Sequence, residues 1–219
     1  MITLDFSAVL VDWPLLAQGL VATTALTAIA APIGLAIGVG CAWARTEGRG
    51  PLCWVAGGYV ELIRNTPFIV QLFFIFFGLP SLGVRLTPEL ASVIAMVINL
   101  GAYAAEIVRA GIEATHKGQV EAGQSLALSR RQIFVYVVLP PALGRVWPAM
   151  SSQIVIVMLG SAVCGQIAAQ ELSYYANLIQ SRNFRAFEAF IIATLLYLCL
   201  SIALRALLRV AGRRWLPVK

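Results

Sequence analysis

The hydrophobic positions of this chain fall into five long runs that short polar segments separate. The runs cover about residues 13–43, 52–79, 88–110, 141–168 and 186–208. A helix needs about 20 mostly apolar residues to cross the hydrocarbon core of a bilayer, and each run reaches that length. The pattern therefore predicts an all-α membrane protein with five transmembrane helices, all in one domain that spans residues 1–219.

Two of these runs carry signals that bear on where their helices begin. The second run contains the polar segment 61–67, which ends in a proline. We therefore expect its first part to lie along the membrane interface and the span proper to start near Arg64. The third run starts with Thr87-Pro88-Glu89. Here threonine can cap the helix, proline fits its first turn, and the acid lies near the positive end of the helix dipole.

Composition supports the membrane assignment. Hydrophobic residues make up 60% of the 219 positions and charged residues only 12%, and the mean hydropathy is +0.85. Soluble domains carry about a quarter charged residues and about half apolar ones. A soluble chain of this length could not bury so much apolar surface, so lipid must be the solvent for much of it.

The basic residues predict the orientation in the membrane. The net charge of +6 could indicate a nucleic-acid partner, but its distribution favours a membrane and no nucleic acid. One set of loops holds twelve basic residues: Arg45, Arg49, Arg109, Lys117, Arg130, Arg131, Arg145, Arg205, Arg209, Arg213, Arg214 and Lys219. The other set holds three, Arg85, Arg182 and Arg185. The positive-inside rule then places the N-terminus outside and the C-terminus in the cytoplasm, together with segment 113–140.

Segment 113–140 is too polar to cross a membrane and has a pattern of its own. Ser129-Arg130-Arg131-Gln132 has the form of a capping box, which predicts a helix start at Ser129. The apolar positions that follow recur at helical spacing until Pro140, which we expect to end that helix. Two short helices joined by a tight turn would form a cytoplasmic docking knob. The periodicity alone fits an ordinary loop between spans equally well.

The spacing within this segment resembles the EAA loop of ABC-importer permeases. That pattern reads E-A-A, three residues, G, nine residues, I, one residue, L-P. The matching positions here are Glu121, Ala122, Gly123, Ala127, Val137, Leu139 and Pro140. The resemblance implies a coupling helix that docks in a groove of a separate ATPase, with Ser129 beginning its second part. Two small residues depart from the pattern, since Gly123 replaces the third alanine and Ala127 replaces the glycine.

Other segments narrow the resemblance to the polar amino-acid branch of these permeases, which includes histidine, glutamine and arginine types. Residues 61–71 are similar to its E-L-x-R-x-T-P-x-x-V-Q segment, and residues 103–112 to its Y-x-A-E-I-x-R-x-G-I segment. The similarity runs from about Gly19 onward. It implies the type I importer permease fold in a bacterial cytoplasmic (inner) membrane, crossed several times.

The same resemblance implies partners and the division of labour among them. It implies a second permease chain, two ABC ATPase subunits that hold ATP and Mg, and an extracytoplasmic solute-binding protein. The function implied is import of polar, possibly basic, amino acids, with no enzymatic activity in this chain. Residues 157–163 lack the Lys-Asp or Lys-Asn pair that the branch often carries there. This departure and those in the loop favour a heterodimer whose partner supplies the missing groups.

Ionisable residues inside the runs are costly and are therefore candidates for function. Glu61 with Arg64, and Glu106 with Arg109, are three residues apart, so each acid can meet its base on one helix face. Each pair could act in gating or simply fasten the bundle. Nearer mid-membrane, four uncharged polar residues could line a substrate pathway or join helices by hydrogen bonds. These residues are Asn99, Tyr103, Gln153 and Ser161.

The sequence offers no sign of catalysis by this chain. No G-x-x-x-x-G-K-[ST] motif occurs, so ATP must be bound elsewhere if transport uses it. No catalytic triad or metal-ligand cluster is apparent, and no cofactor or metal is expected in this chain. The alternative is a small secondary transporter or channel without an ATPase. Such proteins often show repeated halves and a charged site at mid-membrane, and the sequence has neither.

Overall fold

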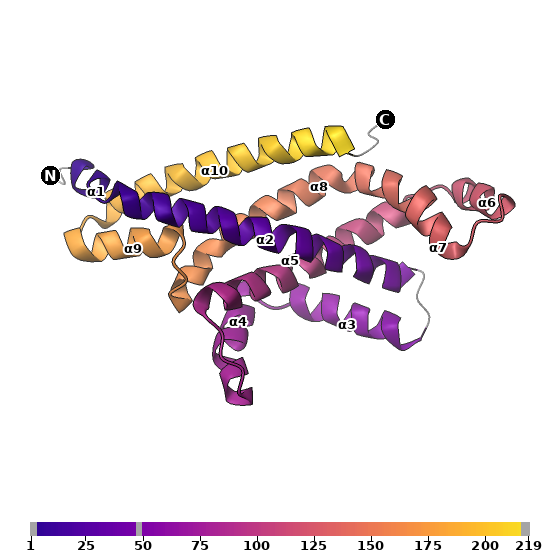
Figure 1. Cartoon of the computed structure of the whole chain (residues 1–219), viewed down its shortest axis with the longest axis horizontal. Coiled ribbons are helices and arrows are strands. Elements are labelled where there is room, and N and C mark those ends of the chain that lie inside the picture. Colours follow the sequence, from indigo (N-terminus) through magenta and orange to yellow (C-terminus); the bar gives the residue numbers. More distant parts are fainter. Residues whose placement is uncertain (1–3, 47–49, 216–219) are drawn as a thin grey trace.

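The computed structural model describes residues 4–46 and 50–215, and every regular element within these ranges is a helix. The α-helices are α1 (Ser7–Leu10), α2 (Trp13–Thr46), α3 (Pro51–Arg64), α4 (Phe68–Phe73), α5 (Pro88–Glu113), α6 (Lys117–Ser125), α7 (Arg130–Gln132), α8 (Leu139–Gly160), α9 (Leu172–Asn183) and α10 (Ala186–Trp215). Figure 1 shows an elongated bundle with α9 at one end and the short helices α6 and α7 at the other.

Four continuous helices of the described ranges are long and apolar enough to cross a membrane. They are α2, α5, the unbroken helical stretch Arg130–Ile167 that contains α8, and α10. The bent pair of α3 and the segment Phe68–Leu82 would make a fifth span if it is counted as one. The predicted all-α membrane class is thus confirmed, with four or five candidate spans among the described residues where the sequence predicted five.

The second hydrophobic run is not one straight span. Helix α3 ends at Arg64, and the axis of the next helical segment, Phe68–Leu82, is bent from it by 111°. Helix α3 packs beside α2 and α5, while α4 leaves the bundle sideways (Figure 1). The expectation that a span begins near Arg64 is therefore wrong. Pro67 accounts for the break, because proline disfavours a helical conformation in the residue before it.

The helix that starts in segment 113–140 does not end at Pro140. Helical structure runs without interruption from Arg130 to Ile167. A π-helical turn, Ile133–Val138, ends two residues before the proline. The ring of Pro140 would strike the carbonyl of Tyr136 in a regular α-helix, and the wider π turn moves that carbonyl away. The docking segment is therefore continuous with α8.

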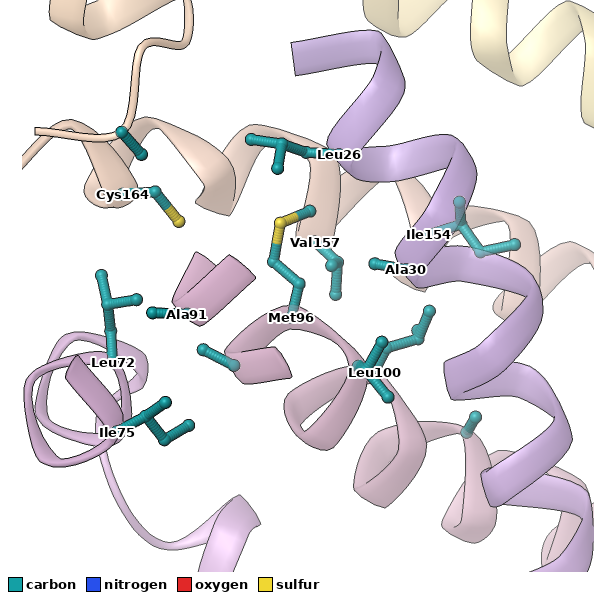
Figure 2. Packing of buried hydrophobic residues seen from close by; sticks show 14 of the residues in the cluster. Leu26, Ala30, Leu72, Ile75, Ala91, Met96, Leu100, Ile154, Val157 and Cys164 are labelled. Atoms are coloured by element: carbon teal, nitrogen blue, oxygen red, sulfur yellow. The ribbon is translucent and has the colours of Figure 1, made fainter. Parts of the chain in front are cut away.

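The core forms where α5 crosses between α2 and α8. Figure 2 shows Met96 and Leu100 of α5 in one cluster with Leu26 of α2 and Ile154 of α8, and all four side chains are buried. Two glycines let α2 approach α5 closely. A Cβ added to Gly38 would lie 2.5 Å from Ala104 Cβ, and one added to Gly34 would lie 2.9 Å from Leu100 Cβ. Small residues at such contacts are typical of helix packing in membranes.

Candidate functional site

A helical hairpin built from α6 and α7 stands at one end of the bundle (Figure 1). Glu121 and Ala122 lie exposed on α6. Gly123, on the opposite face, is buried against the π turn that follows α7. A Cβ added there would lie 3.0 Å from Ile133 Cγ1, which is tighter than most side-chain contacts. The glycine thus lets α6 pack directly on the start of the long helix and holds the hairpin closed.

The turn of the hairpin is a Schellman motif with alanine at its left-handed position. The Leu128 N–H donates to the Gly123 carbonyl at 3.2 Å, and the Ala127 N–H donates to the Gln124 carbonyl at 2.9 Å. Ala127 has φ of 55°, a conformation that usually selects glycine. Leu126, beside it, exposes 75% of its surface at the tip of the turn.

The predicted capping box at Ser129 is also confirmed. The Gln132 N–H donates to Ser129 Oγ at 3.4 Å, and the Ser129 N–H donates to Gln132 Oε1 at 2.8 Å. Ser129 is exposed, whereas Leu139 and Pro140 are half-buried at the start of α8, where Leu139 packs against the main core. The structure therefore divides the predicted coupling residues between an exposed hairpin and its anchor in the bundle.

Three helices meet at one carboxylate near the same end of the bundle. Glu106 of α5 lies 2.7 Å from Arg45 Nη1 of α2, 3.5 Å from Arg64 Nη1 of α3, and in contact with Arg109 one turn away. Arg109 also pairs with Glu113. The Glu106–Arg109 pair is thus confirmed, and Arg45 is a member that the sequence did not reveal, because it falls at the end of its hydrophobic run.

The predicted Glu61–Arg64 pair does not form among the described residues. Arg64 turns toward Glu106, and its guanidinium carbon lies 5.8 Å from the centre of the Tyr103 ring. Glu61 Oε2 instead accepts a hydrogen bond from Asn65 Nδ2 at 3.2 Å. Glu106 is the less exposed of the two acids, so solvent screens its attraction for the Arg64 guanidinium less.

The break between α3 and α4 is held by Gln71, which the sequence did not single out. Its Nε2 donates to the carbonyls of Ile63 at 2.8 Å and Thr66 at 3.0 Å. Asn99 Nδ2 in turn donates to Gln71 Oε1 at 3.0 Å. The last carbonyls of a helix have no partner within that helix, and leaving them unpaired in an apolar setting costs free energy. Gln71 supplies that partner and ties the break to α5.

The four candidate pathway residues do not form one cluster. Asn99 and Tyr103 lie one turn apart on α5 and both face the α3–α4 segment, through Gln71 and Arg64. Gln153 is half-buried on α8. Ser161, just beyond the end of α8, is buried, and its hydroxyl donates a hydrogen bond to the Met158 carbonyl one turn earlier at 2.6 Å. The polar groups around the break are therefore the more coherent part of this set.

The described residues contain no group of three or more histidine, cysteine, aspartate or glutamate side chains that could hold a metal ion. The polar groups that the structure brings together serve instead for hydrogen bonding and ion pairing between helices.

The sequence profile of one protein family matches residues 34–217. The family is described as the binding-protein-dependent transport system inner membrane component. Among curated proteins, the glutamine transport system permease protein GlnP of Escherichia coli is 37% identical over 212 residues, covering 96% of this chain and 97% of that protein. The arginine transport system permease protein ArtQ of Bacillus subtilis is 32% identical over 202 residues, covering 92% of each.

Solved structures agree with these relatives. A chain from the crystal structure of an amino acid ABC transporter with histidines superposes with a TM-score of 0.87 at 36% identity, covering 97% of this chain and 100% of that one. A chain of the inward-facing MetNI methionine ABC transporter gives a TM-score of 0.72 at 23% identity, covering 93% of this chain and 95% of that one. The second likeness shows the fold alone, and both place the helices in the type I importer permease arrangement.

Proposed function

This chain belongs to the family of binding-protein-dependent transport system inner membrane components, and we propose that it imports polar amino acids as one half of an ATP-driven translocation pore. It is a permease subunit of an ABC importer, and ATP hydrolysis takes place in separate subunits. The alternative of a small secondary transporter or channel is set aside, because the family match covers most of the chain.

The substrate class rests on the relatives. The matched permeases are named for glutamine, arginine and cystine, and the similar solved structure is that of an amino acid transporter with histidines. These solutes share the amino-acid backbone and differ in their side chains. We propose a polar amino acid, with basic ones included. An extracytoplasmic solute-binding protein would select and deliver it, so a ligand screen on the cognate binding protein would identify the solute directly.

The α6–α7 hairpin is the observation that carries the coupling proposal. It is exposed at one end of the bundle, Glu121 and Leu126 are both exposed on it, and its second helix is continuous with α8. A push on the hairpin would therefore reach the membrane part along a rigid helix. We propose that the hairpin docks in a groove of the ATPase, with the apolar Leu126 as its anchor and Glu121 as its polar contact.

The remaining assembly follows from the family in outline. We propose two permease chains, two ATPase subunits that hold ATP and Mg, and a position in the bacterial inner membrane with the hairpin in the cytoplasm. The departures at Gly123, Ala127 and residues 157–163 favour a heterodimer. The second permease would then supply the polar groups that residues 157–163 lack.

Substrate-stimulated ATP hydrolysis in proteoliposomes tests the coupling proposal. We expect Glu121→Ala to reduce the stimulation by roughly tenfold, as removing a hydrogen-bonded contact to a charged group does at roughly 1.5 kcal/mol. Leu126→Ala should weaken retention of the ATPase during purification. Glu89→Ala is the matched control, because Glu89 is an exposed glutamate at the opposite end of α5. Unchanged stimulation in Glu121→Ala, with the ATPase still bound, would contradict a coupling role.

A further inference from the structure

A basic groove lies between α8 and α10, apart from the hairpin and the Glu106 cluster. Its volume is about 310 Å³. The residues that line it are Gly144, Trp147, Pro148, Ser151 and Ser152 of α8, with Arg205, Arg209, Gly212 and Arg213 of α10. The three arginines are spaced four apart, so they project from one face of α10 on successive turns.

No carboxylate neutralises these arginines within the described ranges. The ion pairs of that part of the chain involve Arg45, Arg64, Arg109 and Arg185 only. The groove contributes two serine hydroxyls as further hydrogen-bond donors and no acidic side chain. Three like charges on one helix face repel one another, so the site favours an anion that can bridge them.

A hydrogen bond and a close packing contact between α8 and α10 hold the groove in shape. Trp147 of α8 donates from its indole Nε1 to the Leu208 carbonyl of α10 at 2.8 Å. Gly212 makes room for this ring, since an added Cβ would lie 2.2 Å from Trp147 Nε1. The tryptophan therefore joins the two helices below the arginines and sets the distance between the groove walls.

The same face of α10 turns apolar toward the middle of the helix. Leu198 and Ile202 precede Arg205 by seven and three residues, which places them in line with it, and they expose 52% and 61% of their surface. One face of α10 thus offers hydrocarbon contact followed by a cluster of guanidinium groups. The apolar residues could contact the acyl chain of a lipid, and the guanidinium groups could contact its phosphate head group.

We propose that this groove binds the head group of an anionic phospholipid such as phosphatidylglycerol. The guanidinium groups of Arg205, Arg209 and Arg213 hold the phosphate, because arginine forms paired hydrogen bonds with phosphate oxygens. Basic pockets between transmembrane helices are known to take such head groups. The lipid lies against α10 and couples its packing on α8 to the composition of the membrane.

Native mass spectrometry of the permease–ATPase complex tests this assignment. The complex is exchanged into micelles that contain phosphatidylglycerol or phosphatidylcholine, and retained lipid is counted. We expect preferential retention of phosphatidylglycerol in the wild type. The affinity should fall roughly fivefold in Arg209→Gln, and roughly a hundredfold when Arg205, Arg209 and Arg213 all become Gln, from the electrostatic contribution of each arginine. Changing all three to Lys keeps the charge but removes the paired hydrogen bonds, so it should lower the affinity less than the triple Gln change does.

Arg214→Gln is the matched control, because Arg214 lies on the same helix but does not line the groove. An equal loss in this control would overturn the site in favour of general charge. Undiminished phosphatidylglycerol in the triple Gln variant, or equal retention of phosphatidylcholine by the wild type, would also overturn it. Displacement of the lipid by millimolar inorganic phosphate would assign the groove to free phosphate instead.

Loss of a partner subunit from the triple Gln variant, with the lipid retained, would show that the groove is a protein interface. If the triple variant does not fold, Arg209→Gln decides the matter.

Discussion

A single methyl group occupies the place where the turn between α6 and α7 favours glycine. Ala127 has φ of 55°, and a non-glycine residue in this left-handed region loses roughly 1–2 kcal/mol. Glycine would remove that strain but would add roughly 0.4–1 kcal/mol of unfolded-state entropy. We therefore expect Ala127→Gly to stabilise the permease–ATPase complex by roughly 0.5–1 kcal/mol, which raises the apparent Tm by roughly 1–4 °C.

Thermal unfolding of the purified complex measures this effect, and Ala122→Gly provides a control of opposite sign. Ala122 lies inside α6 in a right-handed conformation, where glycine should destabilise by roughly 0.5–1 kcal/mol. If Ala127→Gly lowers the Tm as Ala122→Gly does, the left-handed turn is not under strain.

At the scale of helices, Glu106 joins α2, α3 and α5 near one end of the bundle. Replacing Glu106 with Gln leaves Arg45 and Arg64 without their carboxylate partner and leaves Arg109 with Glu113 alone. The Glu106 side chain is 22% exposed, so the loss should lie below the roughly 3–5 kcal/mol seen for fully buried pairs. We expect on the order of 2 kcal/mol, measured as a lower midpoint of thermal unfolding.

Glu113→Gln is the comparison for that experiment. Among the described residues Glu113 pairs with Arg109 alone, and its side chain is 56% exposed, so its loss should cost below about 1 kcal/mol. Equal effects of the two substitutions would show that Glu106 fastens nothing beyond its own helix.

Helix ends that depend on neighbouring residues could be predicted from the sequence, whereas those that depend on other helices could not. The Thr87 cap formed as predicted, with the Leu90 N–H donating to Thr87 Oγ1 at 3.2 Å, and so did the box at Ser129. The break before α4 is stabilised by Gln71 and Asn99, whose partners are distant in sequence. Pro67 indicated a break in the sequence. Which of the two flanking helices lies in the bundle depends on the packing of α3 on α5, which the sequence does not show.

At the scale of the molecule, hydropathy was sufficient to predict the all-α membrane class. The positions of the charged residues predicted only some of the ion pairs. The five runs gave the helices of the bundle, because burial in lipid leaves a long, continuous signal. The ion pairs were harder to predict, since Arg64 has Glu61 one turn away yet pairs with Glu106 on another helix. Sequence spacing reveals a possible pair within one helix, such as Glu61 with Arg64, but not a pair between two helices. The groove between α8 and α10 likewise exists only because α10 continues as a helix to Trp215.

The orientation of the whole bundle in the membrane is the last prediction. Ser125 in α6 and Ser181 in α9 are exposed hydroxyls at opposite ends of the molecule (Figure 1). Twelve basic residues are assigned to the side of Ser125 and three to the side of Ser181, and positive charge resists translocation. In a background without Cys41, Cys53, Cys164 and Cys199, an impermeant maleimide should label Ser181→Cys in cells whose outer membrane is permeabilised. It should label Ser125→Cys only after the inner membrane is opened as well, and both equally in detergent. The reverse pattern would place the α6–α7 hairpin outside, where no ATPase could reach it, and would refute the coupling proposal together with the orientation.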